Sequence, residues 1–216
     1  MMKQTLKRYK WSLLLSSMVM LLPTVAGLAL WNRLPEVVAT HFDFDNVPNG
    51  WSPKWVVVFG IPAFLLVLHL LCLWAILRVG GGEKGLPVGL LCWIVPFICL
   101  LTEGMVYAYA LELAVDIGLI ACLMMGVLFV ALGNFLPKCR VNSVCGIRVP
   151  WTMNDPDIWA RTHRVAGICM VACGVAILIG AWFESLRVVL FGLFFVAVLV
   201  PLVYSYVIYK KKAFLD

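Results

Sequence analysis

Residues 55–77 read WVVVFGIPAFLLVLHLLCLWAIL, and no aspartate, glutamate, lysine or arginine interrupts them. A helix rises 1.5 Å per residue, so about 20 apolar residues cross a hydrocarbon core of about 30 Å. Backbone N–H and C=O groups find no water in that core, so a segment that spans it must be helical. This stretch therefore predicts a transmembrane helix and decides the fold class.

The rest of the chain has the same character. Of its 216 residues, 63% are hydrophobic and 13% are charged, whereas a soluble domain has about 25% charged residues. We therefore predict an all-α polytopic integral membrane protein with six transmembrane helices. The apolar runs are residues 11–31, 55–77, 85–110, 117–136, 165–183 and 188–209. Pro23, Pro62, Pro96 and Pro201 lie within these runs, where we expect bends rather than breaks.

The basic residues predict the orientation. Most of the 17 lysines and arginines fall before the first run, in the even-numbered connections or after the last run. Only Arg33, Lys54 and Arg187 fall on the opposite side. By the positive-inside rule, both termini are cytoplasmic. The net charge of +6 is explained by this asymmetry, so it gives no reason to expect a nucleic-acid partner.

This topology divides the chain into three parts. Residues 1–78 form a two-span unit with an extracytoplasmic loop at 32–54. Residues 79–116 hold the third span and its linkers. Residues 117–216 form a three-span unit with a cytoplasmic loop at 137–163.

The extracytoplasmic loop alternates polar side chains at His41, Asp43 and Asp45. On an extended segment these three project to one side, a spacing that suits a cation. Val47 occupies the next ligand position of a calcium loop, however, and residues 47–50 read VPNG, an ordinary turn sequence. We therefore expect a turn-rich loop without a metal or other cofactor, and we keep the three residues as candidates for partner binding.

Two ionisable residues lie inside the predicted spans. Glu103 lies in the third and His69 in the second, and such residues are costly in lipid, which makes them functional candidates. The second span runs inward and the third outward, so the two residues lie at different depths. We do not expect them to form one proton relay.

Residues 146–164, GIRVPWTMNDPDIWARTHR, interrupt the apolar sequence on the cytoplasmic side. Asp155 and Pro156 are typical of the first positions of a helix, so the fifth helix is expected to begin before the membrane. Trp159 and His163 are four residues apart and share a face. Residues 146–151 alternate and stop at a proline, which indicates a short segment along the membrane face, with Trp151 at the headgroups.

Topology signals and interface anchors explain the arginines and tryptophans of this region, but they do not explain its other polar residues. Asn134, Asn142, Thr152, Asn154 and His163 are groups that either bond one another or bind a partner. We expect Arg148, with Trp151 and Thr152, to brace the start of the fifth helix.

The same residues carry a family resemblance. The pattern G-N-F-L-P-K-x-R-x-N at 133–142, then G-I-R-V-P-W-T at 146–152 and W-x-x-T-H-R-x-x-G at 159–167, resembles the signature of the SdpI family of bacterial immunity proteins. The outer stretches L-P-E-V-V-A-T-H-F at 34–42 and N-G-W-S-P-K-W at 49–55 are similar to a small domain of unknown function that often precedes the SdpI domain.

This resemblance implies a six-span protein of the bacterial cytoplasmic membrane that protects the cell against a secreted peptide toxin. Some members of the family are also linked to signalling through a cytoplasmic repressor. The candidates for contacts with the toxin, a regulator or membrane lipids are His41, Asp43, Asp45, Glu103, Asn134, Asn142, Arg148, Trp151, Thr152, Trp159, His163 and Arg164.

Two alternatives to immunity are a small transporter or ion pathway and a membrane enzyme. A small transporter or ion pathway would use Glu103 and His69. A membrane enzyme would need its acid, base and electrophile at one depth, whereas the outer and inner polar clusters lie about 30 Å apart across the hydrocarbon. The inner cluster also has no H-E-x-x-H spacing and no glycine-rich phosphate loop, so we expect no catalytic activity.

Overall fold

The computed structural model describes residues 2–43, 45–80 and 88–214. Within these ranges, six helices are long and apolar enough to cross a membrane. They are Leu6–Ala29, Val56–Arg78, Val88–Ala110, Ile117–Lys138, Pro156–Gly180 and Glu184–Ala213. The prediction of an all-α polytopic membrane protein is confirmed. The fifth helix begins well before its apolar run, as its start signals indicate.

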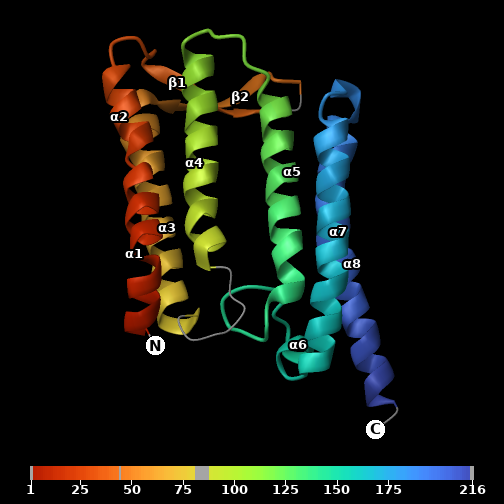
Figure 1. The fold of residues 1–216 in the computed structure, drawn as a ribbon. Helices are drawn as coiled ribbons and strands as arrows, with labels where there is room; N and C mark the ends of the chain where they lie inside the picture. The colour runs from red at the N-terminus through yellow and green to blue at the C-terminus, as the bar shows by residue number, and fades with distance from the viewer. Residues whose placement is uncertain (1, 44, 81–87, 215–216) are drawn as a thin grey trace. The chain divides into compact units, whose positions relative to one another are not determined.

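The chain divides into two compact units. The first is built from Met1–Arg78 and Val88–Ile120, and the second mainly from Ala121–Asp216, so the boundary falls within the first turn of the fourth span. Figure 1 shows the elements of both.

The first unit has three spans. The first span consists of α1 (Met2–Val19) and α2 (Leu22–Ala29), the second of η1 (Val56–Gly60), α3 (Ile61–Ala75) and η2 (Ile76–Gly80), and the third of α4 (Val88–Ala110). Pro23 and Pro62 stand at the first positions of α2 and α3, because proline has no N–H to donate and suits a helix start. Pro96 lies inside the unbroken α4.

A β-hairpin closes one end of this unit (Figure 1). Strand β1 (Val37–Phe42) pairs antiparallel with β2 (Pro48–Pro53), with Val38 opposite Ser52 and Ala39 opposite Trp51. Val38 is buried in an apolar cluster with Leu34, Val57, Val58 and Tyr107. One face of the hairpin is thereby fixed against the helices.

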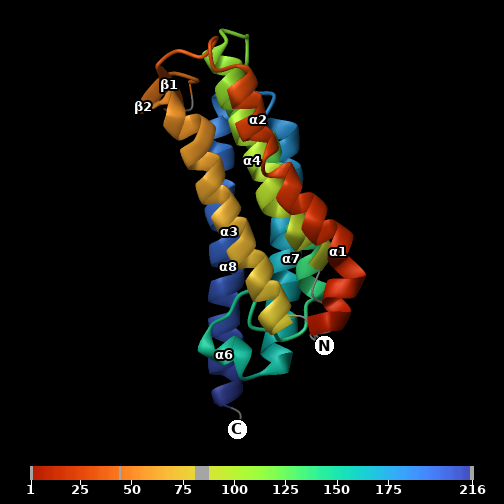
Figure 2. The same cartoon turned by 90° about the vertical axis from the view of Figure 1, so that its left-hand side faces the viewer.

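The second unit contains α5 (Ile117–Phe135), η3 (Leu136–Lys138), α6 (Pro150–Met153), α7 (Pro156–Gly180), η4 (Glu184–Leu186) and α8 (Arg187–Ala213). Helices α7 and α8 pack side by side as an antiparallel pair (Figure 2). The buried Arg187 donates from Nε to the carbonyl of Ala181 at 3.1 Å, which holds the turn between them.

Glycines bring α5 and α7 close together. A Cβ added at Gly133 would lie 2.9 Å from the carbonyl oxygen of Gly167, and one added at Gly126 would lie 3.1 Å from that of Gly174. Such distances leave no room for a larger side chain. Small residues at helix contacts are the usual means of close packing in membranes, where no hydrophobic force drives helices together.

Candidate functional site: a side-chain-locked cap before α7

Residues 139–155, here called the cap loop, connect η3 to α7 and contain only the four-residue helix α6. Backbone polar groups of such a segment need partners from side chains or water. In the cap loop, side chains of the expected motif supply many of them.

Asn142 shapes the first turn of the cap loop. Its Oδ1 accepts hydrogen bonds from the backbone N–H groups of Val144 at 2.9 Å and Cys145 at 2.7 Å. Its Nδ2 donates to the carbonyl of Arg140 at 2.8 Å. The side chain is buried, so three of its hydrogen bonds are used inside the loop.

His163 joins the cap loop to α7. Its Nδ1 lies 2.8 Å from the carbonyl oxygen of Trp159, which can only accept, so Nδ1 carries the proton. Nε2 is then free to accept the N–H of Ile147 at 3.0 Å. The imidazole also stacks on the Trp159 ring with centroids 4.0 Å apart. Both side chains are fully buried, and Trp159 Nε1 donates to the carbonyl of Cys139 at 2.8 Å.

Gly146 makes this approach possible. Its φ is +123°, a conformation that favours glycine, and an added Cβ would lie 2.2 Å from His163 Nε2. Both the backbone conformation and the lack of space beside His163 therefore require a glycine at the first position of the G-I-R-V-P-W-T pattern.

Thr152 and Trp151 fix the second half of the cap loop. Thr152 Oγ1 donates to the carbonyl of Ile147 at 2.6 Å and accepts the N–H of Val149 at 3.1 Å. Trp151 Nε1 donates to Ser205 Oγ on α8 at 3.0 Å, and its ring stacks on Tyr209 with centroids 5.9 Å apart. The cap loop is thus attached to both α7 and α8.

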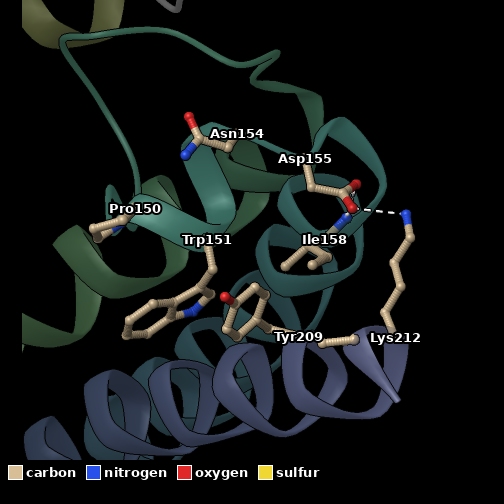
Figure 3. Close-up of a pocket in the computed structure, with 8 residues that line it drawn as sticks. Pro150, Trp151, Asn154, Asp155, Ile158, Tyr209 and Lys212 are labelled. Atoms are coloured by element: carbon tan, nitrogen blue, oxygen red, sulfur yellow. Dashed lines mark hydrogen bonds and ion pairs between the residues drawn. The ribbon is translucent and has the colours of Figure 1, made fainter. Parts of the chain in front are cut away.

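Asp155 ends the cap loop and starts α7. Its side chain accepts from the N–H groups of Asp157 at 2.9 Å and Ile158 at 3.2 Å, which confirms the predicted helix start. Its Oδ2 also pairs with Lys212 Nζ at 2.7 Å. The Lys212 hydrogen bond, followed by that of Ile158, lowers the pKa of the Asp155 carboxyl. Figure 3 shows this pair beside Trp151 and Tyr209 at the rim of a cavity of about 330 Å³.

Val149 is extended and Pro150 takes the first position of α6, so the segment before the proline ends where the sequence indicates. Its place along the membrane face stays a prediction. One expectation for this region is wrong in detail. Arg148 does not brace α7, because its guanidinium donates to the carbonyl of Ser143 within the cap loop.

Burial divides the inner candidates into two groups. Asn142, Thr152, Trp159 and His163 are buried, and Trp151 is half-buried against α8. The polar groups of all five form hydrogen bonds within the cap loop, with α7 or with α8. Asn134, Arg148 and Arg164 are exposed. Among the inner candidates, these three are the side chains that a partner can reach.

The thiols of Cys139 and Cys145 lie on either side of the turn that Asn142 forms. The Cys139 thiol donates to the carbonyl of Phe135 at 3.6 Å. Its interaction with Cys145 holds the pKa of Cys145 below that of an ordinary thiol, helped by the charge of Arg148. The same contact raises the pKa of Cys139. Their spacing on either side of a turn-forming asparagine was the available signal.

The outer candidates do not converge in the described part of the chain. His41 lies on β1 and its Nδ1 bonds Asn49 Oδ1 across the hairpin. Asp43 lies in the turn, where its Oδ1 accepts the N–H groups of Asp45 at 3.0 Å and Val47 at 2.8 Å. The described residues contain no group of three or more metal-ligand side chains. All three residues are exposed.

The two membrane-embedded candidates have different neighbours. His69 is buried and its Nε2 bonds Ser16 Oγ on α1 at 3.2 Å, while its Nδ1 has no partner in the described structure. Glu103 is 2% exposed on α4, near Tyr107, whose hydroxyl donates to the carbonyl of Pro23 at 3.0 Å. One oxygen of Glu103, Oε2, is buried without a partner among the described residues.

Residues 138–205 match the SdpI/YfhL protein family. The family resemblance is confirmed, and the matched region contains the whole cap loop and α7. Residues 18–66, which include the β-hairpin, match a domain of unknown function (DUF1648). Similarity extends over nearly the full length to the Immunity protein SdpI of Bacillus subtilis (strain 168). The two are 26% identical over 204 residues, which cover 92% of this chain and 96% of that protein. No solved structure matches this chain.

Proposed function

We propose that this multi-pass membrane protein confers immunity to a secreted peptide toxin and acts by binding, without a chemical step. The observation that carries the proposal is the similarity to the Immunity protein SdpI over 92% of this chain. The assembled cap supports it, because Asn142, Gly146 and His163 of the family pattern form one locked structure.

The proposal places the protein in the bacterial cytoplasmic membrane with both termini in the cytoplasm. The lysines and arginines support this orientation through the positive-inside rule. The β-hairpin then faces the side from which a secreted toxin arrives. The cap loop faces the cytoplasm.

The two faces have separate roles in this proposal. The hairpin, with His41, Asp43 and Asp45, meets the toxin, and Glu103 lies below it in the same unit. The exposed Asn134, Arg148 and Arg164 of the cap region meet lipid phosphates or a cytoplasmic regulator. Guanidinium groups suit both, since they form bidentate hydrogen bonds with phosphate and carboxylate.

The test is replacement of the relative. A Bacillus subtilis strain lacking its Immunity protein SdpI would express this chain, and colony survival would be counted after exposure to medium from the parent strain and to a panel of secreted amphipathic peptides. Protection by the wild type, absent with an empty vector, is the expected result. Normal membrane abundance without protection against any of these would reject immunity.

A second candidate function rests on the unpartnered Glu103 Oε2. A buried carboxyl oxygen without a hydrogen bond is a functional signal in a membrane protein. An ion pathway through the first unit predicts proton or cation flux in protein-loaded vesicles, and that flux should disappear in Glu103→Gln. Vesicles without such flux would leave immunity as the function.

A further inference from the structure

The hairpin of the first unit carries a cavity on the face opposite its buried cluster. The cavity has a volume of about 510 Å³ and lies between the two strands and the end of α4. Strand residues Val37, Ala39 and Trp51 form one wall, and Tyr109 and Leu113 belong to the other. Val37 and Ala39 are two positions apart and Ala39 pairs with Trp51, so their side chains share one face of the sheet.

Large apolar side chains of this cavity remain in contact with water. Trp51 and Leu113 are each 58% exposed and Val37 is 56% exposed, although all three line the same cavity. On the opposite face of the hairpin, Val38 is 1% exposed because it packs into the apolar cluster. Exposed apolar side chains grouped on one concave face are typical of an interaction site.

The charged side chain that lines the cavity is acidic, Glu112, and exposed Asp43 and Asp45 belong to the same hairpin. The nearby basic side chain of Lys54 is already engaged, because its Nζ pairs with Glu36 at 2.7 Å and lies over the Trp31 ring. A positively charged partner is therefore favoured over a negatively charged one.

Glu112 holds an unusual backbone conformation at this rim. Its φ is +58°, and its N–H donates to the carbonyl of Tyr109 at 2.9 Å in the turn that ends α4. Glycine is the residue that this helix-ending position favours. A glutamate at this position is less stable than a glycine, so the Glu112 side chain can be removed without loss of the turn.

We propose that this cavity binds apolar side chains of a cationic amphipathic peptide, while Glu112 and its acidic neighbours hold the basic side chains of that peptide. The inference rests on the proposed function and names the surface where the toxin binds. Peptides of this class concentrate at the membrane surface. Trp55, 60% exposed at the start of the second span, indicates that the hairpin lies close to that surface.

The experiment uses the full chain in phosphatidylcholine nanodiscs and a fluorescein-labelled peptide of alternating leucine and lysine, with anisotropy as the readout. An alternating leucine–glutamate peptide and empty nanodiscs are the negative probes. Trp51→Ala should weaken binding of the lysine peptide about tenfold, as expected for an aromatic anchor. Trp55→Ala is the matched control, because Trp55 is equally exposed and does not line the cavity.

Two substitutions of Glu112 distinguish an effect on peptide binding from an effect on stability. Glu112→Gln should weaken binding about two- to threefold at low salt and leave it nearly unchanged at high salt, since rim charges are screened. Glu112→Gly should weaken binding equally but unfold at the same or a higher temperature, because glycine relieves the backbone conformation. Glu184→Gln, in the second unit, should change neither.

Three results would overturn the site: equal binding by wild type and Trp51→Ala, equal binding of the leucine–glutamate peptide, or a Trp55→Ala loss as large as that of Trp51→Ala. The survival assay is read separately. Protection that persists in Trp51→Ala would reject the cavity and keep immunity, whereas binding without protection would keep the cavity and reject immunity.

Discussion

The cap loop and the β-hairpin have similar lengths but differ in the direction of their side chains. In the cap loop, motif side chains such as Asn142 and His163 turn inward and bond the loop's own backbone. At the hairpin, Trp51 of β2 and Glu112 from the end of α4 remain exposed around a cavity. The difference teaches that the longer and more specific sequence pattern marks a structure to be maintained. Its buried members maintain the cap loop, and only its exposed members, such as Arg148 and Arg164, remain available to a partner.

The largest effect should follow Gly146→Val. The φ of +123° and the position of His163 Nε2, which an added Cβ would meet, exclude any side chain. We therefore expect a loss of more than about 3 kcal/mol and little folded protein in the membrane. Thermal unfolding of purified protein and membrane abundance measure it. Gly192→Ala on α8 is the control, because a Cβ there meets nothing within 4 Å. Equal abundance of the two variants would contradict the locked cap.

A smaller loss is expected for His163→Ala, about 2–4 kcal/mol. The substitution removes the stacked ring from Trp159 and leaves the N–H of Ile147 without its acceptor. Chemical denaturation in detergent measures the change, with Trp51→Ala in the hairpin as the comparison. The exposed Trp51 should change stability by about 0.5 kcal/mol or less. If the two variants lost equal stability, the contrast between the regions would fail.

The sequence predicted the elements of this fold better than their contacts. Spans follow from hydropathy, and the start of α7 follows from Asp155 and Pro156, because both signals are local. The hydrogen bond between Ile147 and His163 joins residues of a loop and a helix, and no local pattern specifies it.

The hairpin and its cavity also depend on contacts that local sequence patterns do not predict. The alternation of His41, Asp43 and Asp45 suggested one extended side, yet Asp43 turns the chain and caps that turn with its carboxylate. The cavity needs both the strand pairing and the end of α4, so composition alone did not indicate it.

A moderate effect is expected at Asp155, where two variants separate two roles. Asp155→Ala removes the helix cap and the Lys212 pair and should cost about 1–2 kcal/mol. Asp155→Asn keeps a capping oxygen and loses only the ion pair, which should cost about 0.2–1 kcal/mol because both side chains are partly exposed.

The stability of the protein at low pH supplies a further test of Asp155. Its pKa is lowered in the folded protein, so its contribution is present above the ordinary carboxyl range and is lost as pH falls through the folded pKa. Unfolding measured from neutral pH down to about pH 3 should therefore show wild type and Asp155→Asn converging. A constant gap between them would show that the ion pair does not lower this pKa.

The smallest effect concerns Arg148, the exposed motif side chain of an otherwise inward-facing cap. Its charge helps to lower the pKa of Cys145, so more thiolate is present at neutral pH than for an ordinary cysteine. Arg148→Ala should raise that pKa and slow alkylation of Cys145 at pH 7 a few-fold, with stability changed by about 0.5 kcal/mol or less. Peptide-resolved mass spectrometry after a short iodoacetamide pulse measures the rate, and Arg164→Ala, which does not influence this thiol pair, is the control. An unchanged Cys145 rate would remove the electrostatic link. A large loss of stability would show that Arg148 stabilises the cap loop as the buried motif residues do. The contrast between stabilising and exposed motif side chains would then be wrong for Arg148.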